Sequence, residues 1–378
     1  MPAIYVHIPF CKQKCVHCDF NSYSGLDSLH RAYVGALVSE IALQAPALRN
    51  SSDNDLSVSS VYIGGGTPTL IDPAHIDAVL HAIANHFSIT RDVEVSIEAN
   101  PETITLERMA VLKEAGVNRL SIGFQSLDNR CLQVLGRKHS AMQAIDAFNA
   151  ARETGFDNIN IDLIFGIPGQ TIANWASTLE QVTLLDPEHL SCYSLTIEPG
   201  TVLEREIAMG LVETPDEDVQ ADMFTYTIES LRESGFEHYE ISNYAKLGKR
   251  CRHNLTYWNN GDYIGFGAGA HSKMLNIRFS NIASPAEYIK SVESGSCIAE
   301  VIDLSIEDEM SEMLFLGLRK TEGINLEEFK TRFGRPLHAV YGAQVDDLIR
   351  NGLVTWDDRL RLTSRGILFG NEVFSRFI

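Results

Sequence analysis

Residues 5–20 read YVHIPFCKQKCVHCDF, and this stretch decides the fold of the chain. An apolar run with strand character ends at Pro9 and leads into a C-x3-C-x2-C loop that carries Cys11, Cys15 and Cys18. Thiolates are the usual protein ligands of a [4Fe-4S] cluster, which contains four irons. Three thiolates leave one iron open to a ligand from outside the chain. The loop therefore predicts a [4Fe-4S] cluster with one open coordination position.

A structural zinc site is the alternative interpretation of this loop, with His17 as the fourth ligand beside the three cysteines. Zinc sites usually combine two C-x2-4-C pairs that come from separate segments. No second pair follows in this sequence. We therefore prefer the cluster and keep zinc as the alternative.

Composition indicates a globular protein of the reducing cytoplasm. The 378 residues are 44% hydrophobic, which is enough for a sizeable core. Four further cysteines are scattered and form no secreted disulfide pattern, and neither a signal peptide nor a membrane-spanning run is recognisable. A formal net charge of -19 argues against binding to nucleic acid or to anionic lipid and favours small ligands and proteins as partners.

Strand-like and helix-like patterns alternate over the first two hundred residues, which predicts a parallel sheet with crossover helices. Six such units indicate an open (β/α)6 barrel of the partial TIM type instead of a closed eight-fold one. The predicted strands are Ile4 to Ile8, Ser60 to Ile63, Val93 to Ile97, Arg119 to Gly123, Asn160 to Ile164 and Leu190 to Leu195.

Three domains are predicted, of which the barrel occupies residues 1–195. Residues 196–295 form an extension that we expect to pack over the barrel mouth. Residues 296–378 resemble a winged-helix module, with helices followed by a hairpin that turns at Asp357 and Asp358. From Ser305 onward the module has 12 acidic and 10 basic residues, a net charge of -2, so we expect packing or docking and not nucleic-acid binding.

Polar residues and glycines follow the predicted strands at their carboxyl ends, where the ligand site of a parallel βα barrel lies. The second strand ends in Gly64-Gly65-Gly66-Thr67, and missing side chains let a backbone approach a ligand closely. The next three strands end near Glu98 and Asn100, near Gln125, and at Asp162. The recurrence predicts one shared pocket.

Taken together, the cysteine spacing and these strand ends resemble the oxygen-independent coproporphyrinogen III oxidase family of the radical S-adenosylmethionine (SAM) superfamily, over nearly the whole chain. The resemblance implies that SAM fills the open iron through its amino and carboxylate groups. It implies that His17 touches the cofactor through its backbone, and that the loop GFGAGAHS at 265–272 lies near SAM. The other SAM-binding positions that it implies are Tyr5, Gly65, Gly66, Thr67, Glu98, Gln125, Arg137 and Asp162.

Two departures from the oxidases resemble a haem chaperone branch of the same family. The oxidases have a fourth cysteine where this chain has Phe20, and they have a long segment before the cluster motif, whereas four residues precede Tyr5 here. The sequence also contains HNLTYW at 253–258, which matches the H-N-x-x-Y-W motif of that branch at His253, Asn254, Tyr257 and Trp258.

Imidazole is a common axial ligand of haem iron, and aromatic rings offer an apolar surface to a porphyrin. The resemblance thus implies a haem chaperone that delivers haem to acceptor haemoproteins, respiratory enzymes among them, and that has no membrane anchor of its own. A hydrogen-bonded core histidine remains the alternative for His253. Coproporphyrinogen III oxidation by a radical SAM enzyme remains the alternative function.

Overall fold

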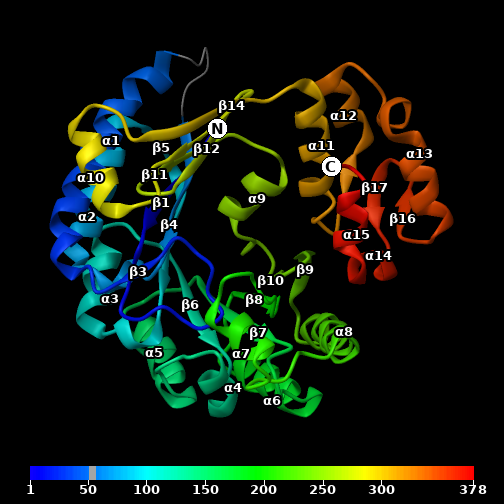
Figure 1. Cartoon of the computed structure of the whole chain (residues 1–378), viewed down its shortest axis with the longest axis horizontal. Helices are drawn as coiled ribbons and strands as arrows, with labels where there is room; N and C mark the ends of the chain where they lie inside the picture. Colours follow the sequence, from blue (N-terminus) through cyan, green and yellow to red (C-terminus); the bar gives the residue numbers. More distant parts are fainter. Residues whose placement is uncertain (51–56) are drawn as a thin grey trace.

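The computed structural model describes residues 1–50 and 57–378 of the chain, and it confirms the open six-stranded barrel (Figure 1). The six predicted strands are present, most of them longer than predicted. They pair in parallel, each with the next one along the chain. Their bounds are Ala3–Ile8 (β1), Ser57–Gly65 (β4), Ser88–Ala99 (β5), Arg119–Gln125 (β6), Ile159–Phe165 (β7) and His189–Ser194 (β8).

Crossover helices cover the outer face of this sheet, as Figure 1 shows for α1, α2, α3 and α5. Predicted caps are present: the Asp72 side chain accepts a hydrogen bond from the Ala74 amide, and Ser140 with Gln143 forms a capping box. The helices run over His30–Asn50 (α1), Pro73–His86 (α2), Leu106–Glu114 (α3), Asn129–Val134 (α4), Ala141–Glu153 (α5) and Ile172–Leu184 (α6).

Five short strands from residues 196–295 extend the sheet at both of its edges, and packing over the barrel mouth stays a prediction for the rest of this segment. An open barrel has two edges whose backbone groups need partners. Strand β11 pairs with β1 at one edge and β10 pairs with β8 at the other. The bounds are Val202–Ala208 (α7), Glu217–Glu233 (α8), Glu237–Glu240 (β9), Asn243–Ala245 (β10), Arg252–Trp258 (α9), Tyr263–Phe266 (β11), His271–Met274 (β12), Ile277–Asn281 (β13), Pro285–Glu293 (α10) and, just beyond, Ile298–Asp303 (β14).

The C-terminal unit has the predicted winged-helix-like form, with the hairpin turn at Asp357 and Asp358 and a hydrophobic core of its own. Its elements are Ile306–Gly317 (α11), Ile324–Asn325 (β15), Leu326–Phe333 (α12), Leu337–Arg350 (α13), Val354–Trp356 (β16), Arg359–Leu362 (β17), Ser364–Leu368 (α14) and Gly370–Ser375 (α15). The division of the chain at residues 195 and 295 stays a prediction.

The inner face of the barrel is polar, because polar residues occupy every second position of its strands. Register places Tyr62 of β4 between Tyr5 of β1 and Ser96 of β5. It likewise sets Glu98 beside Ser121. Figure 1 shows α9 on this inner side, facing the C-terminal unit. Within the described ranges, no helix is both long and apolar enough to cross a bilayer.

Candidate functional site

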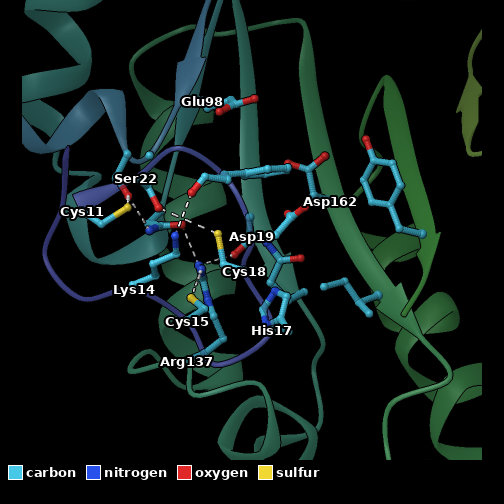
Figure 2. Close-up of a pocket in the computed structure, with 18 of the residues that line it drawn as sticks. Cys11, Lys14, Cys15, His17, Cys18, Asp19, Ser22, Glu98, Arg137 and Asp162 are labelled. Atoms are coloured by element: carbon cyan, nitrogen blue, oxygen red, sulfur yellow. Dashed lines mark hydrogen bonds between the residues drawn. The ribbon is translucent and has the colours of Figure 1, made fainter. Parts of the chain in front are cut away.

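A cavity of about 450 Å³ lies where the parallel strands end, and all three motif cysteines line it (Figure 2). Two short strands at the ends of the cysteine loop pair with each other, Phe10–Cys11 (β2) with Tyr23–Ser24 (β3). The amide of Thr67 also donates to the carbonyl of Phe10 at 2.8 Å, which attaches the loop to the end of β4. The loop is thus held against the barrel on both sides.

Each cysteine sulfur has a different polar neighbour. The Thr67 hydroxyl donates to Cys11 Sγ at 3.7 Å, and Arg137 Nη1 donates to Cys15 Sγ at 3.4 Å. Cys18 Sγ lies 3.9 Å from the Ser22 hydroxyl. Burial raises the pKa of the Cys11 and Cys18 thiols, and the neighbouring cysteines add to this effect. Three adjacent thiolates therefore need positive charge, which iron and Arg137 would supply.

The donor set fits a polynuclear cluster better than a single ion. Among the residues that the structure describes, no three His, Cys, Asp or Glu side chains are grouped closely enough to hold one metal ion. In a [4Fe-4S] cluster, by contrast, each thiolate binds a different iron, so the sulfurs lie farther apart.

Gly66 lies where only a glycine fits. A Cβ atom on this residue would lie 2.7 Å from the carbonyl oxygen of Phe10 and 3.0 Å from Cys11 Sγ. Gly65 has a φ of +117° and packs against the ring of His7, where a Cβ would lie 2.6 Å away. Both glycines line the cavity, so the predicted close backbone approach is present beside the cysteine loop.

Two carboxyl groups face the cavity from the inner wall of the barrel, Glu98 and Asp162 (Figure 2). Glu98 accepts hydrogen bonds from the Tyr62 hydroxyl and the Gly65 amide, both at 3.0 Å. Asp162 accepts from Ser121 at 3.0 Å and from Asn160 at 2.7 Å. Burial, and then the charge of Asp162, raises the pKa of Glu98 to about 7. Such carboxyls suit hydroxyl and ammonium groups of a ligand.

Arg137 and Gln125 complete the wall. Arg137 Nη2 donates to Asn100 at 2.6 Å and to the Gly123 carbonyl at 3.0 Å, so the arginine joins the ends of two strands to Cys15. Gln125 ends β6 at a β-bulge with a φ of +67°, a conformation that non-glycine residues rarely adopt. The Gln125 side chain lines the cavity, and a β-bulge is a common way to redirect a side chain at the end of a strand.

His17 also lines the cavity, and its Nδ1 donates to the Leu135 carbonyl at 3.3 Å. Burial lowers the pKa of His17 to about 4, so the imidazole is neutral at pH 7. Its side chain therefore attaches the cysteine loop to the end of α4. Phe20 lies at the cavity as well, and its side chain is 64% exposed.

Tyr5 and the HNLTYW residues do not line this cavity. Tyr5 lies deeper in the barrel and bonds His7 Nδ1 at 2.9 Å. His253 is only 1% exposed, and both of its ring nitrogens have partners, the hydroxyls of Ser60 at 3.2 Å and of Tyr257 at 3.0 Å. The structure therefore separates the predicted haem residues His253, Asn254, Tyr257 and Trp258 from the cysteine site. The loop at 265–272 does not line the cavity either.

Asn100, predicted at a strand end, lines the cavity as expected, whereas Tyr62 and Tyr193 line it without having been singled out from the sequence. The alternation of the strands contains a signal for Tyr62, because Ser60, Tyr62 and Gly64 share one face of β4 with a polar or small side chain at each position. The same alternation in the other strands would predict which of their residues lie on the inner face of the barrel.

Glu98→Gln is expected to raise the thermal stability of the protein without cluster or SAM at pH 8. In the folded state the pKa of Glu98 is raised from its usual 4.5 to about 7, so ionisation above pH 7 opposes folding. The variant lacks this penalty, which is at most about 3 kcal/mol. The gain should shrink as the pH falls through 7 toward 5, where wild-type Glu98 is protonated. Thermal unfolding of the wild type and the variant at pH 5.5 and pH 8 measures this difference in stability. The exposed control Glu229→Gln should show no such pH dependence, and an equal effect in both variants would contradict the prediction.

Comparison with known proteins assigns this fold and site to a class. Residues 5–182 match the radical SAM superfamily, and residues 304–369 match the HemN C-terminal domain. The structure superposes on coproporphyrinogen III oxidase (HemN) from Escherichia coli, described as a radical SAM enzyme, with a TM-score of 0.86 and 26% identity; the match covers 100% of this chain and 90% of the other.

Relatives that match over their full length identify the family within this superfamily. The haem chaperone HemW of Bacillus subtilis is 37% identical, with 100% of this chain and 99% of that protein covered. HemW of Escherichia coli K12 is 33% identical, with 100% and 98% covered. A mouse mitochondrial radical S-adenosyl methionine domain-containing protein 1 is 36% identical, with 97% and 84% covered. The chain belongs to the HemW haem chaperone family.

Proposed function

We propose that this protein binds haem and transfers it to acceptor haemoproteins in the cytoplasm, and that it carries a [4Fe-4S] cluster with SAM on the open iron. One combination of features supports this proposal most strongly. Three cysteines line the cavity, Phe20 replaces the fourth cysteine of the oxidases, and the chain is similar over its full length to HemW proteins. Respiratory enzymes are among the proposed acceptors.

Cys11, Cys15 and Cys18 would each hold one iron, and the remaining iron would face the cavity. The bound cluster supplies an electron-transfer centre whose open iron takes the amino and carboxylate groups of SAM. Gly65, Gly66 and Thr67 support this proposal by forming a wall without large side chains beside Cys11. Glu98 and Asp162 would accept hydrogen bonds from SAM, while Arg137 would balance the negative charge of the thiolates.

For haem we propose the α9 residues His253, Asn254, Tyr257 and Trp258. Imidazole nitrogen is a common axial ligand of haem, and two aromatic rings follow it on the same short helix. His253 would have to exchange its hydrogen bond to Tyr257 or Ser60 for the iron, so α9 must move when haem binds. Half-buried Tyr257 and Trp258 would then contact the porphyrin.

Haem titration of wild type and His253→Ala tests this proposal. We expect the variant to bind haem at least about tenfold more weakly and to show an altered absorption spectrum, because an iron ligand is lost. His189→Ala is a matched control, since His189 is also fully buried in the barrel with both ring nitrogens hydrogen-bonded. Affinity and spectrum like those of wild type in His253→Ala would remove this residue from the haem site.

Coproporphyrinogen III oxidation is the second candidate, because HemN matches the whole of this chain. In that reaction a propionate side chain of the substrate is oxidatively decarboxylated. An anaerobic assay with coproporphyrinogen III, SAM and a reductant separates the two functions. We expect no protoporphyrinogen, and its formation would overturn the chaperone proposal in favour of the enzyme.

A further inference from the structure

Helix α9 is anchored inside the barrel through its first residues. The buried carboxylate of Glu94 in β5 accepts hydrogen bonds from the backbone amides of Arg252 and His253, both at 3.1 Å. These amides belong to the free N-terminal end of the helix, where a carboxylate is stabilised. Glu94 therefore fixes where α9 begins and directs His253 to the inner face of the sheet.

From His253 a series of direct contacts leads to the SAM pocket. The imidazole stacks on the ring of Tyr62, with ring centres 5.0 Å apart and an interplanar angle of 28°. The Tyr62 hydroxyl donates to one carboxylate oxygen of Glu98 at 3.0 Å, and the Gly65 amide donates to the other at 3.0 Å. Tyr62 is thus in contact both with α9 and with the carboxylate that faces the cavity.

The last residues of α9 contact the C-terminal unit, which lies on the far side of the helix from the sheet (Figure 1). The guanidinium group of Arg319 lies over the ring of Trp258, 4.4 Å from its centre. Lys320 Nζ donates to the side-chain oxygen of Asn259 at 2.5 Å, directly after the helix. One short helix therefore connects the C-terminal unit with Tyr62.

We infer that Tyr62 is a positioning residue for Glu98 and that α9 couples the C-terminal unit to SAM binding through it. This inference rests on the proposed SAM site. A shift of α9, whether caused by a protein docked on the C-terminal unit or by haem at His253, changes the support under Tyr62 and with it the position of the Glu98 carboxylate. SAM and the ligand that moves α9 then influence each other's affinity reciprocally.

The geometry favours coupling over simple core packing of Tyr62. A residue that only filled space would need no hydroxyl, yet the Tyr62 hydroxyl is one of the two hydrogen-bond donors to Glu98 in the described structure. Glu98 faces the cavity from a desolvated position, and burial raises its pKa, so each donor matters for the ionised form. Without Tyr62, one oxygen of the carboxylate loses its fixed direction.

Equilibrium dialysis of labelled SAM against the full-length, anaerobically reconstituted protein tests the first step. Tyr62→Phe keeps the ring and its stack on His253 but removes the hydroxyl. We expect SAM to bind about 5- to 30-fold more weakly, with unchanged iron content and an unfolding temperature lowered by only a few degrees. The control is Tyr244→Phe, because Tyr244 is fully buried and its hydroxyl has no hydrogen-bond partner in the described structure. The control should bind SAM like wild type.

A double-mutant cycle tests the second step. Arg319→Ala removes the contact over Trp258 and also the ion pair with buried Glu240 at 3.6 Å, and we expect it to weaken SAM binding about 3- to 10-fold although Arg319 does not line the cavity. In a Tyr62→Phe background the same change should have an effect below about twofold, since the connection is already broken. Lys320→Ala removes the separate contact to Asn259 and leaves the Arg319–Glu240 ion pair in place, and exposed Arg335→Ala is the control in this unit.

Two outcomes overturn the inference alone: unchanged SAM affinity in Tyr62→Phe, or an Arg319→Ala effect of the same size in both backgrounds. If the reconstituted wild type carries its cluster and binds no SAM, the proposed SAM site fails and the inference fails with it. Weakened binding in Tyr62→Phe together with a lost effect of Arg319→Ala supports the coupling.

Discussion

Alanine at any one of Cys11, Cys15 or Cys18 is expected to abolish reconstitution of the [4Fe-4S] cluster. Among the described residues, these three are the cysteines that line the cavity, so each variant leaves two thiolates for four irons. Ser22 and Thr67 lie beside the sulfurs, but neutral hydroxyls are poor ligands for soft iron-sulfur centres. Iron and sulfide analysis after anaerobic reconstitution, together with the visible absorption of the cluster, measures the loss.

Cys192→Ala is the matched control for these variants, because Cys192 is buried in β8 and does not line the cavity. It should lose stability by about 1 kcal/mol from the small space left in the core, and keep its cluster. Wild-type protein that is purified anaerobically with stoichiometric zinc and without iron or sulfide would contradict the cluster itself and restore the zinc interpretation.

Gly66→Ala is expected to disturb the cluster and the SAM site while the barrel stays folded. The added Cβ would lie 2.7 Å from the backbone oxygen of Phe10, which cannot rotate away as a flexible side chain can. Either the end of β4 or the cysteine loop must therefore shift. We expect the loop to shift, because β4 is paired with a strand on each side. We expect cluster content to fall by half or more and SAM affinity to fall by about tenfold, which corresponds to about 1.4 kcal/mol.

Gly35→Ala is the control for this glycine. Gly35 lies within α1, a Cβ there would meet nothing within 4 Å, and alanine is favoured over glycine inside a helix. This variant should keep full cluster content and unfold at the same or a higher temperature. Wild-type cluster content and SAM affinity in Gly66→Ala would show that the close approach to Phe10 is not needed for the site.

If both predictions hold, the cavity and α9 can be assigned separate tasks. The cavity combines thiolates, small residues and two enclosed carboxyls, all fixed to the ends of parallel strands. In the described structure, the rings and hydroxyls on the inner face of the barrel join the helix to this site. Cluster content can therefore distinguish variants of the cavity from variants of α9, whereas SAM affinity is expected to respond to both.

Features that depend on near neighbours could be read from the sequence alone. Three cysteines within eight residues define a ligand set whatever the rest of the chain does. The six parallel strands follow from strand-like runs that alternate with helix-like patterns along the chain, and the carboxyl ends of parallel strands meet at one edge. Those two facts were sufficient to predict the open barrel and the cavity residues at the strand ends, whereas Arg137 was implied only by the family resemblance.

Only the tertiary structure decided where the HNLTYW residues lie and what the extension does. The hydrogen bond between Ser60 and His253 joins residues 193 positions apart, and no local pattern encodes such a contact. Likewise, the short strands of residues 196–295 carry too little signal by themselves; they form because the open edges of β1 and β8 offer backbone partners. The cysteine loop is a local property of this chain, whereas the route from the C-terminal unit through α9 to Glu98 exists only once distant segments have packed together.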